Sequence, residues 1–324
     1  MRAIRVHQPG GPEVLELEDV PEPRPAAGEA LVRLEAVGVN FIEVYQRTGQ
    51  YHLPLPFTPG TEGAGRVVEV GPDVTGLKAG DRVAGVDFKG SYAELALAPV
   101  ERLVVLPESI EVKLAAAVML QGMTAHYLAI STYPLTGESH CLIHAAAGGT
   151  GLLLCQIAKL RGARIIGTVS TPEKAALATG AGANDVVLYT RQNFVEEVRR
   201  LTGGKGVHVV YDSVGKSTFE GSLDSLRPRG MLVLFGQSSG PVPPVDPQVL
   251  NRKGSLYLTR PTLVHHTVTR AELSGRATDL FRWIADGSLT VRIDRTYPLA
   301  EAAKAQVALQ GRQTTGKVLL VPVP

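Results

Sequence analysis

Apolar and polar residues alternate in short runs over the first part of the chain. A period of two predicts half-buried strands, and it occurs in ALVRLEAVGV, GRVVEVG, DRVAGV, AELALAP and RLVVLPE. Only residues 41–49, FIEVYQRTG, indicate a short helix here, and Gly49 ends it. This region therefore predicts a β-rich, largely antiparallel domain.

From residue 111 onward the pattern changes to apolar strands that alternate with helices. Residues 111–130 predict a long helix that is interrupted near Gly122. Strands are then expected at 140–145, 164–169, 185–189, 207–212 and 231–236, with helices beginning near 149, 172, 194 and 218. Because these strands are apolar at consecutive positions, both faces of their sheet are expected to be covered. The succession predicts an α/β fold with a doubly wound parallel sheet.

The last part of the chain does not continue this alternation. A helix in AELSGRATDLFRWIADG leads through TYPLAEAAKAQVALQ to a final strand, KVLLVP. We expect this tail to return to the first domain. Residues 1–122, completed by 265–324, would then form one domain, and residues 123–264 would form a nucleotide-binding domain.

Composition and charge narrow the classes of function. Of the 324 residues 44% are hydrophobic and 20% charged, which is typical of a compact soluble protein. The net charge of +2 arises from 33 basic and 31 acidic residues without a basic block, so no nucleic-acid partner is expected. Two cysteines, an N-terminus without a signal-peptide core and the expected lack of a membrane-spanning run favour the cytoplasm and no membrane partner.

Residues 144–151, HAAAGGTG, lie between an expected strand and an expected helix. Ala146, Gly148 and Gly151 take the three glycine positions of a dinucleotide loop, and Gly149 is added. Gly148 would let the backbone approach a pyrophosphate, and Gly151 would let the helix lie close to the strand. A turn that uses small residues for packing alone would read the same way. The surrounding strand–helix–strand order favours a nucleotide.

The end of the next strand favours NADP over NAD. An NAD site needs Asp or Glu there to hold the ribose 2′-hydroxyl, but the segment reads GTVSTPEK and has no acid before Glu173. Ser170, Thr171 and Lys174 instead offer hydroxyls and a positive charge to a 2′-phosphate. An ordinary helix cap before Pro172 is equally expected, and the two roles are compatible.

With these motifs in view, the chain resembles the zeta-crystallin-like quinone oxidoreductases, a zinc-independent branch of the medium-chain dehydrogenase/reductase superfamily. The resemblance covers nearly the whole chain and rests on GGPEVLELEDVP, GVNFIEVYQRTGQY, PFTPGTEGAGRV, AGDRV, HAAAGGTGLLLCQIAK, VVYDSVG and GSLYLTRPTL. It implies a GroES-like β-rich catalytic domain, a Rossmann domain that binds NADPH, and a site in the cleft between them.

The same comparison implies that no metal is bound. Asn40 stands where the zinc alcohol dehydrogenases of the superfamily have a Cys ligand, and Thr61 stands where they have a His. The four-cysteine lobe of their structural zinc is missing. Among the eight histidines, His265 and His266 are adjacent, and adjacent residues point apart in a strand. A catalytic zinc site needs three side-chain donors from Cys, His or acidic residues.

The resemblance also assigns residues to the site. Tyr45 and Asn40 would face the nicotinamide and the substrate, and Tyr51 would form a wall. Tyr45 could donate a hydrogen bond to a developing oxyanion, or it could be a core aromatic residue. The cofactor residues implied besides those of the glycine loop and the NADP site are Phe41, Tyr45, Tyr127, Thr150, Tyr189, Ser213, Phe235, Gly236, Ser238 and Arg312.

The expected activity is NADPH-dependent reduction of a quinone, by hydride or by single electrons, without zinc. Two alternatives stay open: an NADPH-dependent alkenal or enone reductase, and a non-catalytic NADPH-binding protein of the crystallin or RNA-associated kind. The resemblance further implies a homodimer, since the superfamily associates through the edge of its nucleotide sheet, where GSLYLT is apolar.

Overall fold

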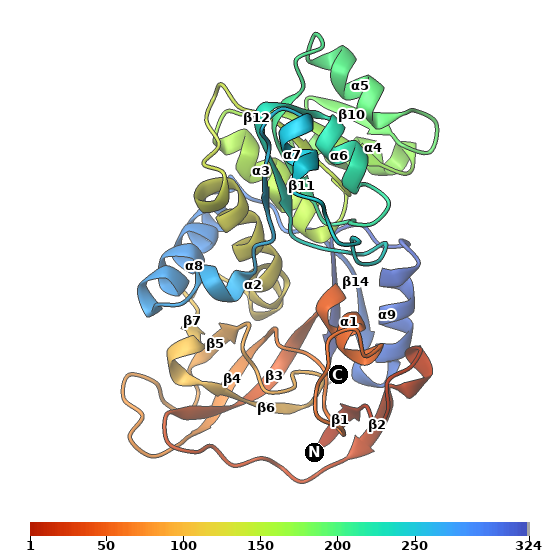
Figure 1. Ribbon diagram of the computed structural model, residues 1–324. Helices are drawn as coiled ribbons and strands as arrows, with labels where there is room; N and C mark the ends of the chain where they lie inside the picture. Colours follow the sequence, from red (N-terminus) through yellow and green to blue (C-terminus); the bar gives the residue numbers. More distant parts are fainter. Residues whose placement is uncertain (323–324) are drawn as a thin grey trace. The chain divides into compact units, whose positions relative to one another are not determined.

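The computed structural model describes residues 1–322, and the chain divides into two compact units (Figure 1). The first unit comprises residues 1–121, 269–286 and 291–322, and the second comprises residues 122–268 and 287–290. Residues 122, 265–268 and 287–290, which were expected in the first domain, therefore belong to the second unit.

The first unit is built on a mostly antiparallel sheet in the order β14-β15-β3-β4-β5-β7, with β6 also paired to β3. Its strands are β3 (Glu29–Val39), β4 (Gly63–Val70), β5 (Arg82–Gly85), β6 (Leu95–Pro99), β7 (Val104–Val105), β14 (Ile293–Pro298) and β15 (Lys317–Val321). A separate pair is formed by β1 (Arg2–Arg5) and β2 (Glu16–Asp19). Because β15 runs antiparallel to β3, the returning tail completes this unit.

Three helices accompany this sheet: α1 (Phe41–Arg47), α8 (Arg270–Ala285) and α9 (Ala302–Gln310). The helix α1 begins directly after β3, and α9 lies beside it in Figure 1. The Arg47 guanidinium donates a hydrogen bond of 2.9 Å to Gln310, which ties the two helices together. The alternating apolar residues of the strands, such as Val32, Leu34 and Val83, are fully buried in the core.

The second unit has a fully parallel six-stranded sheet in the order β10-β9-β8-β11-β12-β13. Its strands are β8 (His140–Ile143), β9 (Arg164–Val169), β10 (Asp185–Leu188), β11 (Val207–Asp212), β12 (Leu226–Leu234) and β13 (Tyr257–Thr259). Its helices are α3 (Gly149–Leu160), α4 (Pro172–Gly180), α5 (Phe194–Leu201), α6 (Phe219–Asp224) and α7 (Gln248–Arg252). This strand order is that of the Rossmann fold, as the sequence predicted.

The order reverses between β8 and β11, since the chain builds outward from β8 to one side and then crosses to the other. Leu142, Ile166 and Val210 on the three central strands are fully buried, which explains why these strands read as continuous apolar runs. Ligands of such folds bind at the carboxyl ends of the strands, at this switch point.

The long helix differs from its prediction in two ways. The helix α2 (Val112–Tyr127) continues through Gly122 without a break, and the irregular turn comes later, as a π-helix over Leu128–Thr132. Together they make 21 residues, which are long and apolar enough to cross a membrane by length and composition. The expectation that no run reaches that length is therefore wrong. However, 72% of the most apolar window is buried within the protein, as in a core helix.

Candidate functional site

The glycine loop turns tightly from β8 into α3. Its left-handed residue is Ala145, with a φ of 51°, so Ala146 at the first glycine position keeps a backbone that alanine tolerates. A Cβ on Gly151 would lie 2.3 Å from the carbonyl oxygen of Ala145. Glycine is therefore required at residue 151 for the helix to approach the strand, and the N-terminus of α3 begins at Gly149 after Gly148.

The residues predicted to hold a 2′-phosphate gather at the carboxyl ends of β9 and β10. Ser170 follows β9, and Thr171 caps α4 by accepting a hydrogen bond of 3.3 Å from the backbone of Lys174. Tyr189 follows β10, and its neighbour Thr190 donates a hydrogen bond of 2.9 Å to the carbonyl of Ser170. The capping role and the cluster of hydroxyls and positive charge therefore coexist in one place.

The loops after β11 and β12 also touch one another. Phe235 donates a backbone hydrogen bond of 2.8 Å to the carbonyl of Asp212, and Ser238 donates one of 3.2 Å to Ser213. A Cβ on Gly236 would lie 2.6 Å from the carbonyl oxygen of Ser213. The four predicted residues of these loops therefore form a second cluster, also at the carboxyl ends of the parallel strands.

In the first unit an aromatic cluster lines α1 and the segment that follows it. The rings of Phe41 and Tyr45 have centroids 6.2 Å apart, and those of Tyr45 and Tyr51 pack edge to face at 5.3 Å. Tyr45 is buried, whereas 38% of Tyr51 is exposed. These three side chains thus form one aromatic surface.

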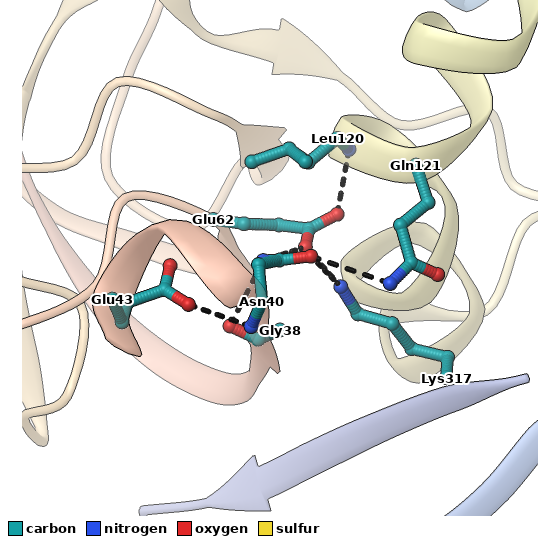
Figure 2. Close-up of polar contacts among 7 residues, drawn as sticks. All are labelled: Gly38, Asn40, Glu43, Glu62, Leu120, Gln121 and Lys317. Carbon is teal, nitrogen blue, oxygen red and sulfur yellow. Dashed lines mark hydrogen bonds and ion pairs between the residues drawn. The ribbon is translucent and has the colours of Figure 1, made fainter. Parts of the chain in front are cut away.

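Asn40, at the start of α1, is committed to an internal network (Figure 2). Its amide oxygen accepts hydrogen bonds from the Lys317 ammonium, at 2.7 Å, and from Gln121, at 3.4 Å. Its amide nitrogen donates to the Glu62 carboxylate, at 2.9 Å, and to the carbonyl of Gly38, at 3.4 Å. All four hydrogen-bonding positions of the amide are therefore used within the unit.

The network is centred on a buried ion pair between Lys317 and Glu62. The two side chains are 1% and 0% exposed, and their charged atoms lie 2.5 Å apart. The second carboxylate oxygen of Glu62 accepts a hydrogen bond of 2.6 Å from the backbone of Leu120 in α2. A Cβ on Gly38 would lie 2.0 Å from a Glu62 oxygen, so only glycine leaves room for the pair.

These residues do not fit a catalytic zinc ion. Asn40 and Thr61 replace two of the expected ligands, and both oxygens of Glu62 already have partners. The Lys317 ammonium adds a positive charge where zinc would need anionic or neutral donors. His265 and His266 were expected in a strand, which is wrong, because both lie in a short 3-10 helix, Leu263–His266.

Two of the predicted cofactor residues lie on other elements of the chain. Tyr127 is the last residue of α2, is buried, and stacks its ring on His266 with centroids 4.2 Å apart. Arg312 is exposed after α9 in the first unit, with a φ of 56°.

Sequence reasoning missed the partners of Asn40. Lys317 begins a strand and Glu62 precedes one, so each reads as an ordinary surface charge at a strand end. Nothing local marks them as a buried pair, because 255 residues separate them. The one available signal was Gly38, a glycine inside an expected strand.

Two family profiles match this chain. The alcohol dehydrogenase GroES-like domain matches residues 26–108, and the zinc-binding dehydrogenase profile matches residues 149–283. A quinone oxidoreductase of Pseudomonas aeruginosa is 49% identical over 315 residues, which cover 97% of each chain. The chain belongs to the quinone oxidoreductase family. This family lies within the medium-chain dehydrogenase/reductase superfamily, as the sequence motifs indicated.

Two further relatives bear on the activity of quinone oxidoreductases. The solved structure of the Escherichia coli quinone oxidoreductase complexed with NADPH is 44% identical, has a TM-score of 0.98, and covers 99% of this chain and 100% of that one. A 2-haloacrylate reductase of a Burkholderia species is 42% identical, over 99% of this chain and 98% of its own length.

A second buried carboxyl lies beside the network. Burial raises the pKa of Glu43 to about 8, although the charge of Lys317 partly opposes the shift. One oxygen of Glu43 accepts a hydrogen bond of 2.6 Å from the backbone of Asn40, and the other has no partner. The cluster therefore holds one cation, one anion and a carboxyl that is protonated at neutral pH.

Glu43→Gln should change how stability depends on pH. Between the unfolded pKa near 4.5 and the folded value of about 8, the folded wild type holds a proton that the unfolded chain has lost. Its free energy of unfolding should therefore fall as pH rises, by up to about 1.4 kcal/mol per pH unit. Urea unfolding between about pH 5 and pH 8 should show a flatter dependence in the variant.

The matched control is Glu69→Gln, which changes an exposed carboxylate on β4. This control should keep the pH dependence of the wild type. A Glu43→Gln profile parallel to that of the wild type would mean that Glu43 is ionised in the folded protein.

Proposed function

We propose that this protein reduces quinones with NADPH and without a metal. The observation that carries the proposal is a Rossmann unit whose β9 is followed by Ser170 and Thr171, with Lys174 in the first turn of α4 and no acid before Glu173. The relation to quinone oxidoreductases, one of them solved with NADPH, supports the same activity.

The second unit is proposed to bind the dinucleotide. At Gly151 the backbone of α3 lies close to that of Ala145. The N-terminus of α3 suits a pyrophosphate, since free backbone N–H groups and the helix dipole favour anions. Lys174 and Tyr189 would hold the adenosine 2′-phosphate, and the loops that carry Ser213 and Ser238 would hold the nicotinamide half. Tyr127 and Arg312 are proposed as further contacts, on the resemblance alone.

The aromatic surface of Phe41, Tyr45 and Tyr51 is proposed to take the flat acceptor. NADPH supplies a hydride, which brings two electrons, and one proton from water balances the hydroquinone. A quinone accepts hydride without a Lewis acid because its product is aromatic. The Tyr45 hydroxyl would donate to the developing oxyanion. Asn40 is proposed to position α1 and not to touch the substrate, because its amide is fully engaged.

A second candidate is reduction of an activated C=C bond. The relation to a 2-haloacrylate reductase favours it, and the same hydride geometry would serve both acceptors.

Turnover with 1,4-benzoquinone, a 2-alkenal and 2-chloroacrylate should separate the candidates. We expect NADPH oxidation with the quinone, followed by the absorbance of reduced nicotinamide. Tyr45→Phe should lower kcat by at least about tenfold, because an oxyanion donor is lost. Turnover of the alkenal or the haloacrylate without the quinone would favour the second candidate, and tight NADPH binding without any turnover would indicate a non-catalytic protein.

Lys174→Ala should discriminate between the two nicotinamide cofactors. Loss of a charge-assisted contact to the 2′-phosphate should raise the KM for NADPH roughly tenfold and leave that for NADH unchanged. Steady-state kinetics with both cofactors would measure this. Lys205→Ala, an exposed lysine before β11, is the control. Equal effects of Lys174→Ala on both cofactors would remove the 2′-phosphate assignment.

We also propose that two copies associate through β13. This strand lies at the edge of the six-stranded sheet, and 57% of Tyr257 is exposed. An edge with unpaired backbone groups and apolar side chains favours pairing with another strand. Tyr257→Asp should convert a dimer to a monomer in analytical ultracentrifugation. A monomeric wild type, or a variant that stays dimeric, would contradict this proposal.

A further inference from the structure

A chain of buried side chains crosses the carboxyl ends of three neighbouring strands in the second unit. Thr168 on β9, His144 directly after β8 and Asp212 at the end of β11 are at most 2% exposed, and so is Ser222 on α6. The hydroxyl of Thr168 lies 2.9 Å from Nδ1 of His144, and Nε2 lies 3.0 Å from the hydroxyl of Ser222. Ser222 in turn lies 2.8 Å from a carboxylate oxygen of Asp212.

The direction of every hydrogen bond in this chain follows from Asp212. A carboxylate only accepts, so Ser222 donates its single proton to Asp212 and must accept from Nε2 of His144. Burial lowers the pKa of His144, which keeps the imidazole neutral. The proton on Nε2 then leaves Nδ1 bare, so Nδ1 accepts from Thr168. One tautomer of one histidine therefore satisfies all four groups.

Each end of the chain is tied to loops proposed to bind the dinucleotide. At one end, the carbonyl of Thr168 accepts a hydrogen bond of 3.1 Å from Ala146 in the glycine loop, and Ser170 follows two residues later. At the other end, Asp212 accepts from the backbones of Val214 and Gly215, at 2.7 and 3.0 Å.

The carboxylate of Asp212 also accepts a hydrogen bond of 2.7 Å from Thr218, before α6. Its carbonyl accepts one of 2.8 Å from Phe235 in the loop after β12. The chain thus spans the switch point of the sheet, where loops from both halves must be held in one geometry for a rigid ligand.

We propose that His144 is a positioning residue for NADPH, which sets the glycine loop, the 2′-phosphate loop and the nicotinamide loops relative to one another through its Nε2–H tautomer. This inference rests on the proposed function of the second unit. The imidazole would act through Thr168, Ser222 and Asp212.

The two links of the chain should have different effects on nucleotide affinity. Thr168→Val removes the bond to Nδ1 and loosens the β9 side, so the dissociation constant of NADPH should rise roughly tenfold, and that of NADH much less. Ser222→Ala removes the link to Asp212 and loosens the nicotinamide loops, so both constants should rise together. Quenching of protein fluorescence or calorimetric titration measures all of these constants.

Thr202→Val is the matched control. Thr202 is also buried and hydrogen-bonded, but it lies before β11, at the amino ends of the strands. Thr202→Val should lower the melting temperature as Thr168→Val does, but it should leave the dissociation constants of NADPH and NADH unchanged. If Thr168→Val and Ser222→Ala behave like Thr202→Val, the chain is structural only and the proposal fails.

A second measurement needs no nucleotide. Long-range nitrogen–proton NMR spectra of the free protein should show His144 neutral, with its proton on Nε2 and a bare Nδ1. A proton on Nδ1, or an imidazolium, would overturn the proposed direction of the chain. If the wild type binds no NADPH although this tautomer is found, the proposed function fails and His144 keeps only its hydrogen bonds.

Discussion

The first unit depends on the buried ion pair between Lys317 and Glu62. Removal of one partner from such a pair costs about 3–5 kcal/mol, because the other charge is left without compensation in a medium of low dielectric constant. The pair joins β15 to the start of β4, and through Asn40 and Leu120 it also fixes the first turn of α1 and the middle of α2. Gly38 leaves the space for it. The aromatic surface on α1 is therefore held by an interaction that is itself hidden from solvent.

The same ion pair engages the donor atoms at the place where the resemblance puts the zinc ligands of related dehydrogenases. Asn40 is neutral and has no lone pair left over, and the charge of Glu62 is balanced by an ammonium on the same chain. The Lys317 ammonium is buried in the core, so it cannot contact and polarise a substrate carbonyl. This arrangement agrees with the proposed acceptors, a quinone or an activated alkene, because both accept a hydride without a Lewis acid.

In the second unit the loops are held by a chain of directional hydrogen bonds instead of an ion pair. In the proposed tautomer of His144, the hydrogen bonds from Thr168 through His144 and Ser222 to Asp212 all point the same way. Such a chain resists small displacements of the loops, because a shift in one hydroxyl leaves another buried group unsatisfied. These four groups are of the kinds found in catalytic sites. Because they are buried, we infer that they position the surrounding loops instead.

Local patterns in the sequence determined most of the elements and the class of cofactor. Residues 164–169 and 207–212 form strands with the predicted bounds, and α3 and α4 begin at the predicted residues. These predictions depend on residues that are near one another in the sequence, so they need no knowledge of the fold. They rest on apolar periodicity, on Pro172 after a threonine cap and on the missing acid after β9. Only the tertiary structure decided that Asn40 is an internal anchor, that α2 continues through Gly122, and that Lys317 and His144 are buried. Their partners lie 255 and 78 residues away in Glu62 and Ser222, and no local pattern records which distant side chain will neutralise a charge or accept a proton.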